Sequence, residues 1–202
     1  MPFPDCRLYL LFTPDLCAGD PWKTLEMAID GGVDAVQWRV KTEDRPGFAR
    51  CREMCRQRRV PLLVNDDVML AVRWQADGAH VGQDDMPVEA ARKLLTDGWL
   101  GISTHDTAQI TAAAAAGADY VGFGPCHKTA TKGYDAGKTP AQIEGAIETA
   151  QQLRLPLFAI GGITPDNLRP LRLLGVDRIA VSSWILQSDT PREAAATLRG
   201  GL

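Results

Sequence analysis

Short apolar runs rich in β-branched residues alternate along this chain with longer segments of helical period, from one end to the other. The runs predict eight strands, at residues 7–13, 33–40, 61–65, 78–81, 99–102, 120–123, 156–160 and 178–181. Alternating strands and helices with short loops indicate parallel strands joined by helical crossovers. We therefore predict an α/β fold, a single (β/α)8 TIM barrel that takes up residues 1–202. An open doubly wound sheet is the alternative, but its glycine fingerprint is missing after the first predicted strand.

Four predicted helices begin at a recognisable cap. Asp20, Thr139, Thr164 and Thr190 each stand directly before a proline, and proline suits the first helical turn. After Thr139 and Thr190 an amide or an acid follows at the spacing of a capping box, and Thr164 is a weaker copy of this pattern. These positions predict where the helices begin, and Gly31 predicts where the first of them ends.

Composition narrows the class of protein. The chain has 22 Lys+Arg against 25 Asp+Glu and a net charge of −3, so we expect no nucleic-acid partner. No stretch approaches the roughly 20 apolar residues of a membrane span, and the N-terminal residues lack the regions of a signal peptide, so we expect a cytoplasmic protein without membrane association. The five cysteines are odd in number and scattered, which fits reduced thiols. Cys51 and Cys55 share a helix face, where core packing is favoured over a metal site.

Polar residues gather at the C-terminal ends of the predicted strands, the rim that carries the active site in this fold. They are Gln37, Arg39, Lys41, Asn65, Asp66, Gln83, Asp84, Asp85, Ser103, His105, Gly161, Gly162, Ser182 and Ser183. Gln37, Arg39 and Lys41 alternate with apolar residues, which places the three side chains on one strand face. In a barrel that face points inward, and two cations beside an amide form an anion site. In another fold the same pattern would be a half-exposed strand.

Two acidic pairs follow neighbouring strands. Asp66 and Asp67 come after the third predicted strand, and Asp84 and Asp85 after the fourth. Helix capping is a common role of Asp, so capping and function can be divided between the members of each pair. Two carboxylates at one rim that share a divalent metal, completed by substrate phosphate, form the usual Mg²⁺ arrangement.

Three late turns suit phosphate. The polar loop 126–137 is longer than the usual connection of about two to six residues, and such loops are often functional; a mobile surface excursion is the alternative. Gly161-Gly162 and Ser182-Ser183 follow the seventh and eighth predicted strands, where barrels often bind phosphate through backbone N–H groups. A tight turn would also explain the two glycines.

The remaining charged and titratable residues carry weaker signals. The arginine cluster at residues 50–59 has acidic neighbours and is interpreted as a solvated outer helix face. His80, on a predicted strand, is interpreted as a structural residue, whereas His105 and His127 fall near the predicted site.

Six motifs in order resemble those of the thiamine-phosphate synthase family. They are Gln37-Trp38-Arg39-Val40-Lys41, Val64-Asn65-Asp66-Asp67, His80-Val81-Gly82-Gln83-Asp84-Asp85, Gly101-Ile102-Ser103-Thr104-His105, the stretch from Ala118 to Pro125 with Thr129-Ala130-Thr131-Lys132, and Ala159-Ile160-Gly161-Gly162-Ile163. Each motif is modest alone, but six in register are highly specific, and the resemblance runs in order over nearly the whole chain, from about Leu8 to Ile185.

The resemblance implies a Mg²⁺-dependent transferase. Such an enzyme joins 4-amino-2-methyl-5-(diphosphomethyl)pyrimidine to a thiazole phosphate, with a carboxylated thiazole left open, and releases thiamine phosphate and pyrophosphate. Asp66 and Asp85 would hold Mg²⁺. The resemblance places Gln37, Arg39, Lys41, Asn65 and Lys132 on the pyrimidine diphosphate, Ser103 near the pyrimidine, and Thr129, Thr131, Gly162, Ser182 and Ser183 on the thiazole phosphate. It singles out Arg39, Ser103 and Lys132 as catalytic.

Two departures and two alternatives accompany this interpretation. His127-Lys128 stands where the family has an aromatic residue and a proline, and the first strand ends in Thr13-Pro14-Asp15. The related thiazole tautomerase binds a thiazole phosphate on the same barrel, but it places a His where this chain has Pro125 and lacks the pair of metal carboxylates. A phosphate-ligand binder without activity is the other alternative. The expected partners are small-molecule substrates, and a homo-oligomer is left open.

Overall fold

The computed structural model describes residues 5–128 and 136–202. Its elements are β1 (Leu8–Phe12), the 3₁₀ helix η1 (Pro14–Leu16), α1 (Pro21–Asp30), β2 (Ala35–Trp38), α2 (Arg45–Arg58), β3 (Leu62–Asn65), α3 (Val68–Arg73), β4 (Gly78–Val81), α4 (Val88–Leu94), β5 (Trp99–Thr104), α5 (Thr107–Ala115), β6 (Tyr120–Phe123), α6 (Pro140–Gln152), β7 (Leu157–Ile160), α7 (Pro165–Leu173), β8 (Ile179–Val181), α8 (Ser183–Leu186) and α9 (Pro191–Gly200).

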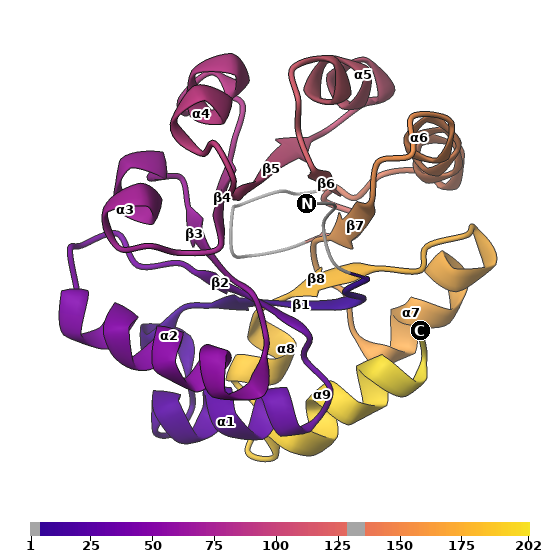
Figure 1. Cartoon of the computed structure of the whole chain (residues 1–202). Coiled ribbons are helices and arrows are strands. Elements are labelled where there is room, and N and C mark those ends of the chain that lie inside the picture. Colours follow the sequence, from indigo (N-terminus) through magenta and orange to yellow (C-terminus); the bar gives the residue numbers. More distant parts are fainter. Residues whose placement is uncertain (1–4, 129–135) are drawn as a thin grey trace.

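The eight strands form one closed parallel barrel in chain order, surrounded by helices (Figure 1). The first and last strands complete the ring, with Leu8 opposite Ile179 and Leu10 opposite Val181. The predicted (β/α)8 barrel is therefore confirmed. The strand bounds differ slightly from the prediction: β2 stops at Trp38, two residues early, and β5 continues to Thr104.

The helix starts follow the predicted caps with one exception. Asp20 Oδ1 accepts from the backbone N–H groups of Trp22 and Lys23 at 3.0 and 2.9 Å. Thr139 forms a full capping box at the start of α6. Helix α9 begins at Pro191 as predicted, but within the described chain the Thr190 side chain makes no capping hydrogen bond. A preceding turn organises this start instead, because Ser188 Oγ accepts from Thr190 N at 3.0 Å.

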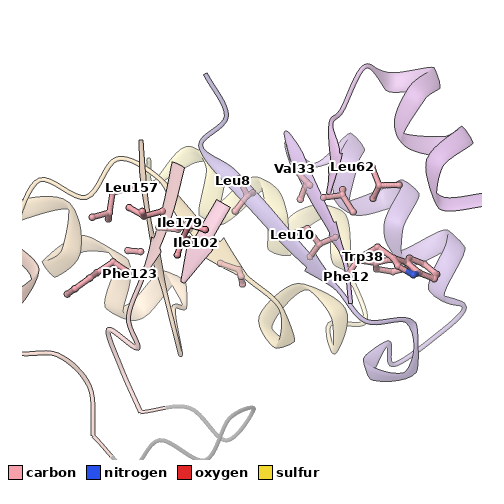
Figure 2. Close-up of a cluster of buried hydrophobic side chains, with 14 of the residues drawn as sticks. Leu8, Leu10, Phe12, Val33, Trp38, Leu62, Ile102, Phe123, Leu157 and Ile179 are labelled. Carbon is pink, nitrogen blue, oxygen red and sulfur yellow. The ribbon is translucent and has the colours of Figure 1, made fainter. Parts of the chain in front are cut away.

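The apolar strand residues divide between two hydrophobic clusters. Leu8, Leu10 and Phe12 pack outward in the cluster that includes the helices, and Figure 2 shows them projecting from β1 with Trp38 beside Phe12. The inward cluster contains no helix residue and consists of Cys6, Tyr9, Leu11, Ala35, Leu63, Tyr120, Phe158 and Ala180. Both strand faces are buried, as expected for a parallel barrel, and the period of two decides which residues reach its interior.

The expectations for cysteines and the arginine cluster are also confirmed. Cys51 and Cys55 are 0% and 1% exposed and lie in the outer core, and all five cysteines are free thiols. On the outer face of α2, Arg56 pairs with Glu53, and Arg58 pairs with Glu26, each at 2.9 Å. Across residues 5–128 and 136–202, no helix is long and apolar enough to cross a membrane.

Candidate active site

The three polar residues in and after β2 differ in how deeply they are buried. Gln37 lies inside the barrel and is 2% exposed, which confirms that this strand face points inward. Because β2 ends at Trp38, Arg39 and Lys41 lie beyond the strand, and the prediction that one strand face carries all three side chains is wrong in this respect. Arg39 stays attached to β1, since its backbone N–H donates to the Phe12 carbonyl at 2.9 Å, and is half-buried, whereas Lys41 is exposed.

Arg39 brings positive charge to the rim. Burial lowers the pKa of its guanidinium, and the carboxylate of Asp66 acts in the opposite direction. Arginine remains protonated at neutral pH despite such a decrease. A fixed cation that interacts with Asp66 therefore lies between the ends of β2 and β3.

In the acidic pair after β3, Asp67 serves as a helix cap and Asp66 does not. Asp67 caps α3, with its Oδ1 accepting from Leu70 N at 2.8 Å. Asp66 has a left-handed backbone, with φ of 64°, and its N–H donates to the His80 carbonyl at 2.7 Å. Aspartate is one of the few residues that tolerate this conformation. The β3–α3 connection thus leaves capping to one carboxylate and holds the other at the rim beside β4.

The second acidic pair does not cap a helix. Asp85 Oδ2 accepts from Gly82 N at 2.6 Å and closes the β4–α4 connection, and Pro87 is the residue before α4. Asp84 is exposed. Neither member of this pair serves as the N-cap, so the capping alternative is wrong for both.

The donor set of Asp66 and Asp85 suits Mg²⁺ completed by substrate. Asp66 and Asp85 follow adjacent strands, in which Asn65 lies opposite His80. Residues 5–128 and 136–202 contain no group of three or more His, Cys, Asp or Glu that could hold a metal by themselves. Mg²⁺ is usually bound by one or two carboxylates, with water and substrate phosphate as the other ligands, so two carboxylates are sufficient.

A chain of hydrogen bonds inside the barrel links two of the predicted site residues. Gln37 Nε2 donates to Tyr9 OH at 3.0 Å, and the hydroxyl oxygens of Tyr9 and Tyr120 are 2.9 Å apart. Tyr120 OH lies 3.1 Å from His80 Nδ1, and His80 Nε2 lies 2.9 Å from Ser103 Oγ. His80 was interpreted as structural, but it contacts a predicted substrate residue directly.

Two glycines make room for this chain. A Cβ atom at Gly101 would collide with the Tyr120 ring and would lie 2.5 Å from His80 Nδ1. A Cβ atom at Gly122 would come within 3.3 Å of His80 Cε1. Sequence reasoning missed Tyr9 and Tyr120 as site residues. The signal for both is an inward strand position, and for Tyr120 also the glycine opposite it on β5, Gly101.

The Gly161-Gly162 turn has a packing role. Both glycines have positive φ values, of 102° and 61°. A Cβ atom at Gly161 would lie 2.6 Å from Pro125 Cβ, and one at Gly162 would lie 2.5 Å from the Lys128 carbonyl oxygen. The connection after β6 therefore packs directly on this turn, which explains the glycines without a ligand. Their contact with phosphate stays a prediction.

His127 lies next to this turn. Its N–H donates to the Gly161 carbonyl at 3.1 Å, and its ring is half-buried. Nε2 is buried without a hydrogen-bond partner among the described residues, and desolvation lowers the pKa of the ring. His105, the other predicted neighbour, has its Nδ1 2.7 Å from the Gly124 carbonyl oxygen.

The remaining predicted residues are divided between β8 and an undescribed loop. Ser182 Oγ donates to the Leu11 carbonyl at 3.0 Å, so its proton is already used in joining β8 to β1. Ser183 is the first residue of α8, a helix that the sequence did not predict. Thr129, Thr131 and Lys132 lie outside the described residues.

A separate hollow lies at the opposite end of the barrel. It has a volume of about 480 Å³ and is lined by residues that include Val33 and Asp34, which precede β2, and Arg199 of α9. Among the described residues that line it, none is a predicted site residue.

Comparison with known proteins gives one consistent result. The sequence model of the thiamine monophosphate synthase family matches residues 8–185. A thiamine-phosphate synthase of Bacillus velezensis is 39% identical over 199 residues, which cover 93% of this chain and 87% of that protein. One of Synechocystis is 40% identical over 96% of this chain, and this chain spans 56% of that longer relative.

Solved structures agree with the sequence comparison. A thiamine phosphate pyrophosphorylase from Pyrococcus furiosus superposes with a TM-score of 0.85 at 28% identity, covering 97% of this chain and 95% of the other. A 3-hexulose-6-phosphate synthase, at a TM-score of 0.68 and 16% identity, shares the fold alone.

Proposed function

Because the chain belongs to the thiamine monophosphate synthase family and is a transferase of that family, we propose that its rim joins an aminopyrimidine diphosphate to a thiazole phosphate. The products are thiamine phosphate and pyrophosphate. The observation that supports this most strongly is the arrangement after β3, where Asp67 caps α3 while Asp66 stays at the rim and interacts with Arg39. A barrel that only needed a helix cap would not require the second carboxylate in a left-handed conformation.

The reaction needs charge and position more than a protein nucleophile. The C–O bond between the pyrimidine methylene and the diphosphate breaks, and its electron pair leaves with pyrophosphate. The aminopyrimidine ring supports the resulting methylene cation, which the lone pair of the thiazole nitrogen captures to form the C–N bond. Groups that stabilise the leaving charge accelerate this step, since they interact more strongly with the transition state than with the substrate.

Individual residues are proposed to divide this work. Arg39 and Lys41 would bind the diphosphate oxygens, and half-burial makes Arg39 the stronger of the two because solvent screens it less. Asp66 and Asp85 would hold Mg²⁺, which supplies further positive charge to the departing pyrophosphate. Asn65 and Lys132 complete the proposed diphosphate site.

The second substrate is proposed to bind at the opposite half of the rim. Thr129, Thr131, Gly162 and the Ser182-Ser183 turn would contact the thiazole phosphate. Ser182 would contribute oxygen lone pairs, since its hydroxyl proton is donated to Leu11. Ordered positioning of two reactants supplies a large part of such a rate enhancement.

One assay tests the proposal against its alternatives. The purified chain is mixed with both substrates and Mg²⁺, then with EDTA in place of Mg²⁺, and thiamine phosphate is measured. We expect product with Mg²⁺ and loss of turnover with EDTA. A thiazole tautomerase would instead convert the thiazole phosphate alone, without metal, and a binder would change neither substrate. Absence of thiamine phosphate in the presence of Mg²⁺ contradicts the proposed activity.

A further inference from the structure

Counting protons assigns one direction to the hydrogen-bond chain from Gln37 to Ser103, the direction in which each hydroxyl proton has an acceptor. Gln37 Nε2 donates to Tyr9 OH. In this assignment the Tyr9 proton is directed to the oxygen of Tyr120, 2.9 Å away, and the single Tyr120 proton to His80 Nδ1, 3.1 Å away. A neutral imidazole that accepts at Nδ1 carries its proton on Nε2, which donates to Ser103 Oγ at 2.9 Å.

We propose that this directed chain selects the substrate ring, with Tyr9, Tyr120 and His80 as positioning residues. Gln37 is left with its carbonyl oxygen to offer to a ligand, because its amide nitrogen is held by Tyr9. Ser103 is left with its hydroxyl proton to offer, because its oxygen accepts from His80. The inference rests on the proposed function and specifies which substrate edge the pyrimidine site accepts.

The complementary ligand has a hydrogen-bond donor at one position and an acceptor at the other. An aminopyrimidine fits, since its amino group donates to the Gln37 carbonyl oxygen and a ring nitrogen accepts from the Ser103 hydroxyl. The corresponding oxo-pyrimidine presents a carbonyl oxygen where the amine was. Two acceptors then face each other in a site with few alternative partners, and a buried group without a partner is costly.

The position of the two phenols keeps this direction fixed. Tyr9 lies opposite Ala35, two residues before Gln37, and Tyr120 lies opposite Gly101, two residues before Ser103. Both phenols therefore lie one interior layer below the groups that face the substrate. Tyr9 and Tyr120 are 1% and 0% exposed. Burial raises the pKa of both hydroxyls, so each keeps its proton at neutral pH.

Aromatic packing holds the middle of the chain. The Tyr9 and Tyr120 rings meet edge to face at 5.9 Å between centroids. Phe158 packs edge to face on both, at 5.4 and 5.6 Å, without a hydrogen-bonding group of its own. Phe158 therefore offers a matched control, because its replacement disturbs the same packing and leaves the hydrogen bonds in place.

The tautomer of His80 in the wild-type protein tests the direction. The protein has only three histidines, so ¹⁵N–¹H correlation spectra of the imidazoles can be assigned by the loss of one set in His80→Gln. We expect His80 in the wild-type protein to be neutral at pH 7 with its proton on Nε2. A proton on Nδ1, or a doubly protonated ring, would overturn the proposal.

Substrate discrimination tests the consequence. We expect the wild-type enzyme to prefer the aminopyrimidine diphosphate over its oxo analogue by at least about 100-fold in kcat/KM, as in sites built around a specific hydrogen bond. In Tyr120→Phe, the Tyr9 proton can turn toward Gln37, whose amide can then rotate and offer a donor. The preference should fall by about 10-fold, while the KM for the thiazole phosphate stays within about twofold.

The controls separate this idea from a structural role and from the proposed function. Phe158→Leu should lower the Tm and keep the wild-type preference. If Tyr120→Phe does not fold, Tyr9→Phe removes the neighbouring link and should reduce the preference in the same way. If the wild-type enzyme makes thiamine phosphate and the folded Tyr variant keeps the wild-type preference for the aminopyrimidine over its oxo analogue, only this inference is overturned. If the wild-type enzyme makes no thiamine phosphate, the proposed function fails, while the His80 tautomer still decides the direction of the chain.

Discussion

The two halves of the barrel rim are built differently. After β2 to β5 the proposed chemistry depends on side chains, such as Arg39, Asp66 and Ser103. After β6 to β8 the connections pack closely through their backbones, and Gly161 and Gly162 lie against the connection that follows β6. In the first half of the rim, after β2 to β5, a side chain can be replaced while the fold remains intact, and we call it the side-chain half. In the second half, after β6 to β8, the backbone atoms that would contact the ligand also hold the connections together, so substitution there affects the fold as well, and we call it the backbone half.

The largest effect should come from the side-chain half. Asp66→Asn removes a charge and keeps the shape, and Asn also tolerates a left-handed backbone. We expect turnover to fall by about 10²–10³-fold, the usual size for losing one group that stabilises transition-state charge. The Tm should change little. Steady-state rates at saturating Mg²⁺, together with a thermal unfolding curve, measure both quantities.

Asp84→Asn is the matched control for this prediction. Asp84 is an exposed acidic residue at the same rim, next to the proposed ligand Asp85. Its variant should keep turnover within about twofold, since surface substitutions away from special features have small effects. If Asp66→Asn and Asp84→Asn behave alike, the charge of the rim as a whole matters and the proposed metal ligand is wrong.

An intermediate effect is expected in the backbone half, and there stability and binding should change together. Gly162→Ala places a Cβ atom 2.5 Å from the Lys128 carbonyl oxygen at a φ of 61°. We expect the free energy of unfolding to fall by about 1–3 kcal/mol and the KM for the thiazole phosphate to rise. Urea unfolding and initial rates at varied thiazole phosphate measure the two effects.

Gly145→Ala controls for the loss of a glycine as such. Gly145 lies inside α6, and its nearest neighbour to an added Cβ would be Thr107 Cγ2 at 3.9 Å. Alanine should stabilise the protein there by about 0.5–1 kcal/mol because a helix-interior glycine is unfavourable. A Gly162→Ala protein with normal stability and a normal KM would show that the backbone half tolerates side chains after all.

The smallest effect should come from His127, a side chain in the backbone half whose surroundings leave one polar atom without a hydrogen bond among the described residues. Nε2 of His127 is buried and has no partner among the described residues. His127→Phe removes that atom and should raise the free energy of unfolding by about 1 kcal/mol, within the range for a buried unsatisfied group. Urea unfolding at pH 7.5 measures the difference.

The pH dependence of the free energies of unfolding of the wild-type protein and His127→Phe identifies the cause of their difference. Desolvation lowers the pKa of folded His127 from its ordinary value of 6.5, so the unfolded chain binds a proton more readily. The contribution of His127 to the free energy of unfolding is therefore fully present above pH 6.5 and is lost progressively as the pH falls below 6.5. The Phe variant lacks this loss, and its advantage should widen toward pH 5. An advantage that stays constant with pH would point to packing alone.

Local patterns predicted most of the fold because they depend on near neighbours in the chain. The strands were located to within about three residues, and the caps at Asp20 and Thr139 form as expected. Thr190 does not cap α9 with its side chain, and a turn precedes the helix instead, in which Ser188 Oγ accepts from Thr190 N. The period of two also placed Gln37 inside the barrel correctly.

The site was predicted less completely because its contacts depend on how strands meet across the barrel. His80 touches Ser103 only because β4 and β5 pair in one particular register, and Tyr120 reaches His80 because Gly101 has no side chain. The Ser182 hydroxyl is bound to Leu11, on a strand that lies far away in the sequence. No local pattern contains this information. Capping within the acidic pair after β3, by contrast, was expected from the sequence because it follows a short-range rule.

The pairing of β1 with β8 has a consequence for synthesis. On the ribosome, Leu11 emerges long before Ser182, so the hydrogen bond between them must wait for almost the whole chain. Strands β2 to β5 can pair with sequence neighbours as they appear, but β1 keeps one open edge until β8 is made. An open strand edge can bind another chain. The nascent protein therefore depends on its last strand for protection from association, and the barrel rim is complete only after that strand is made.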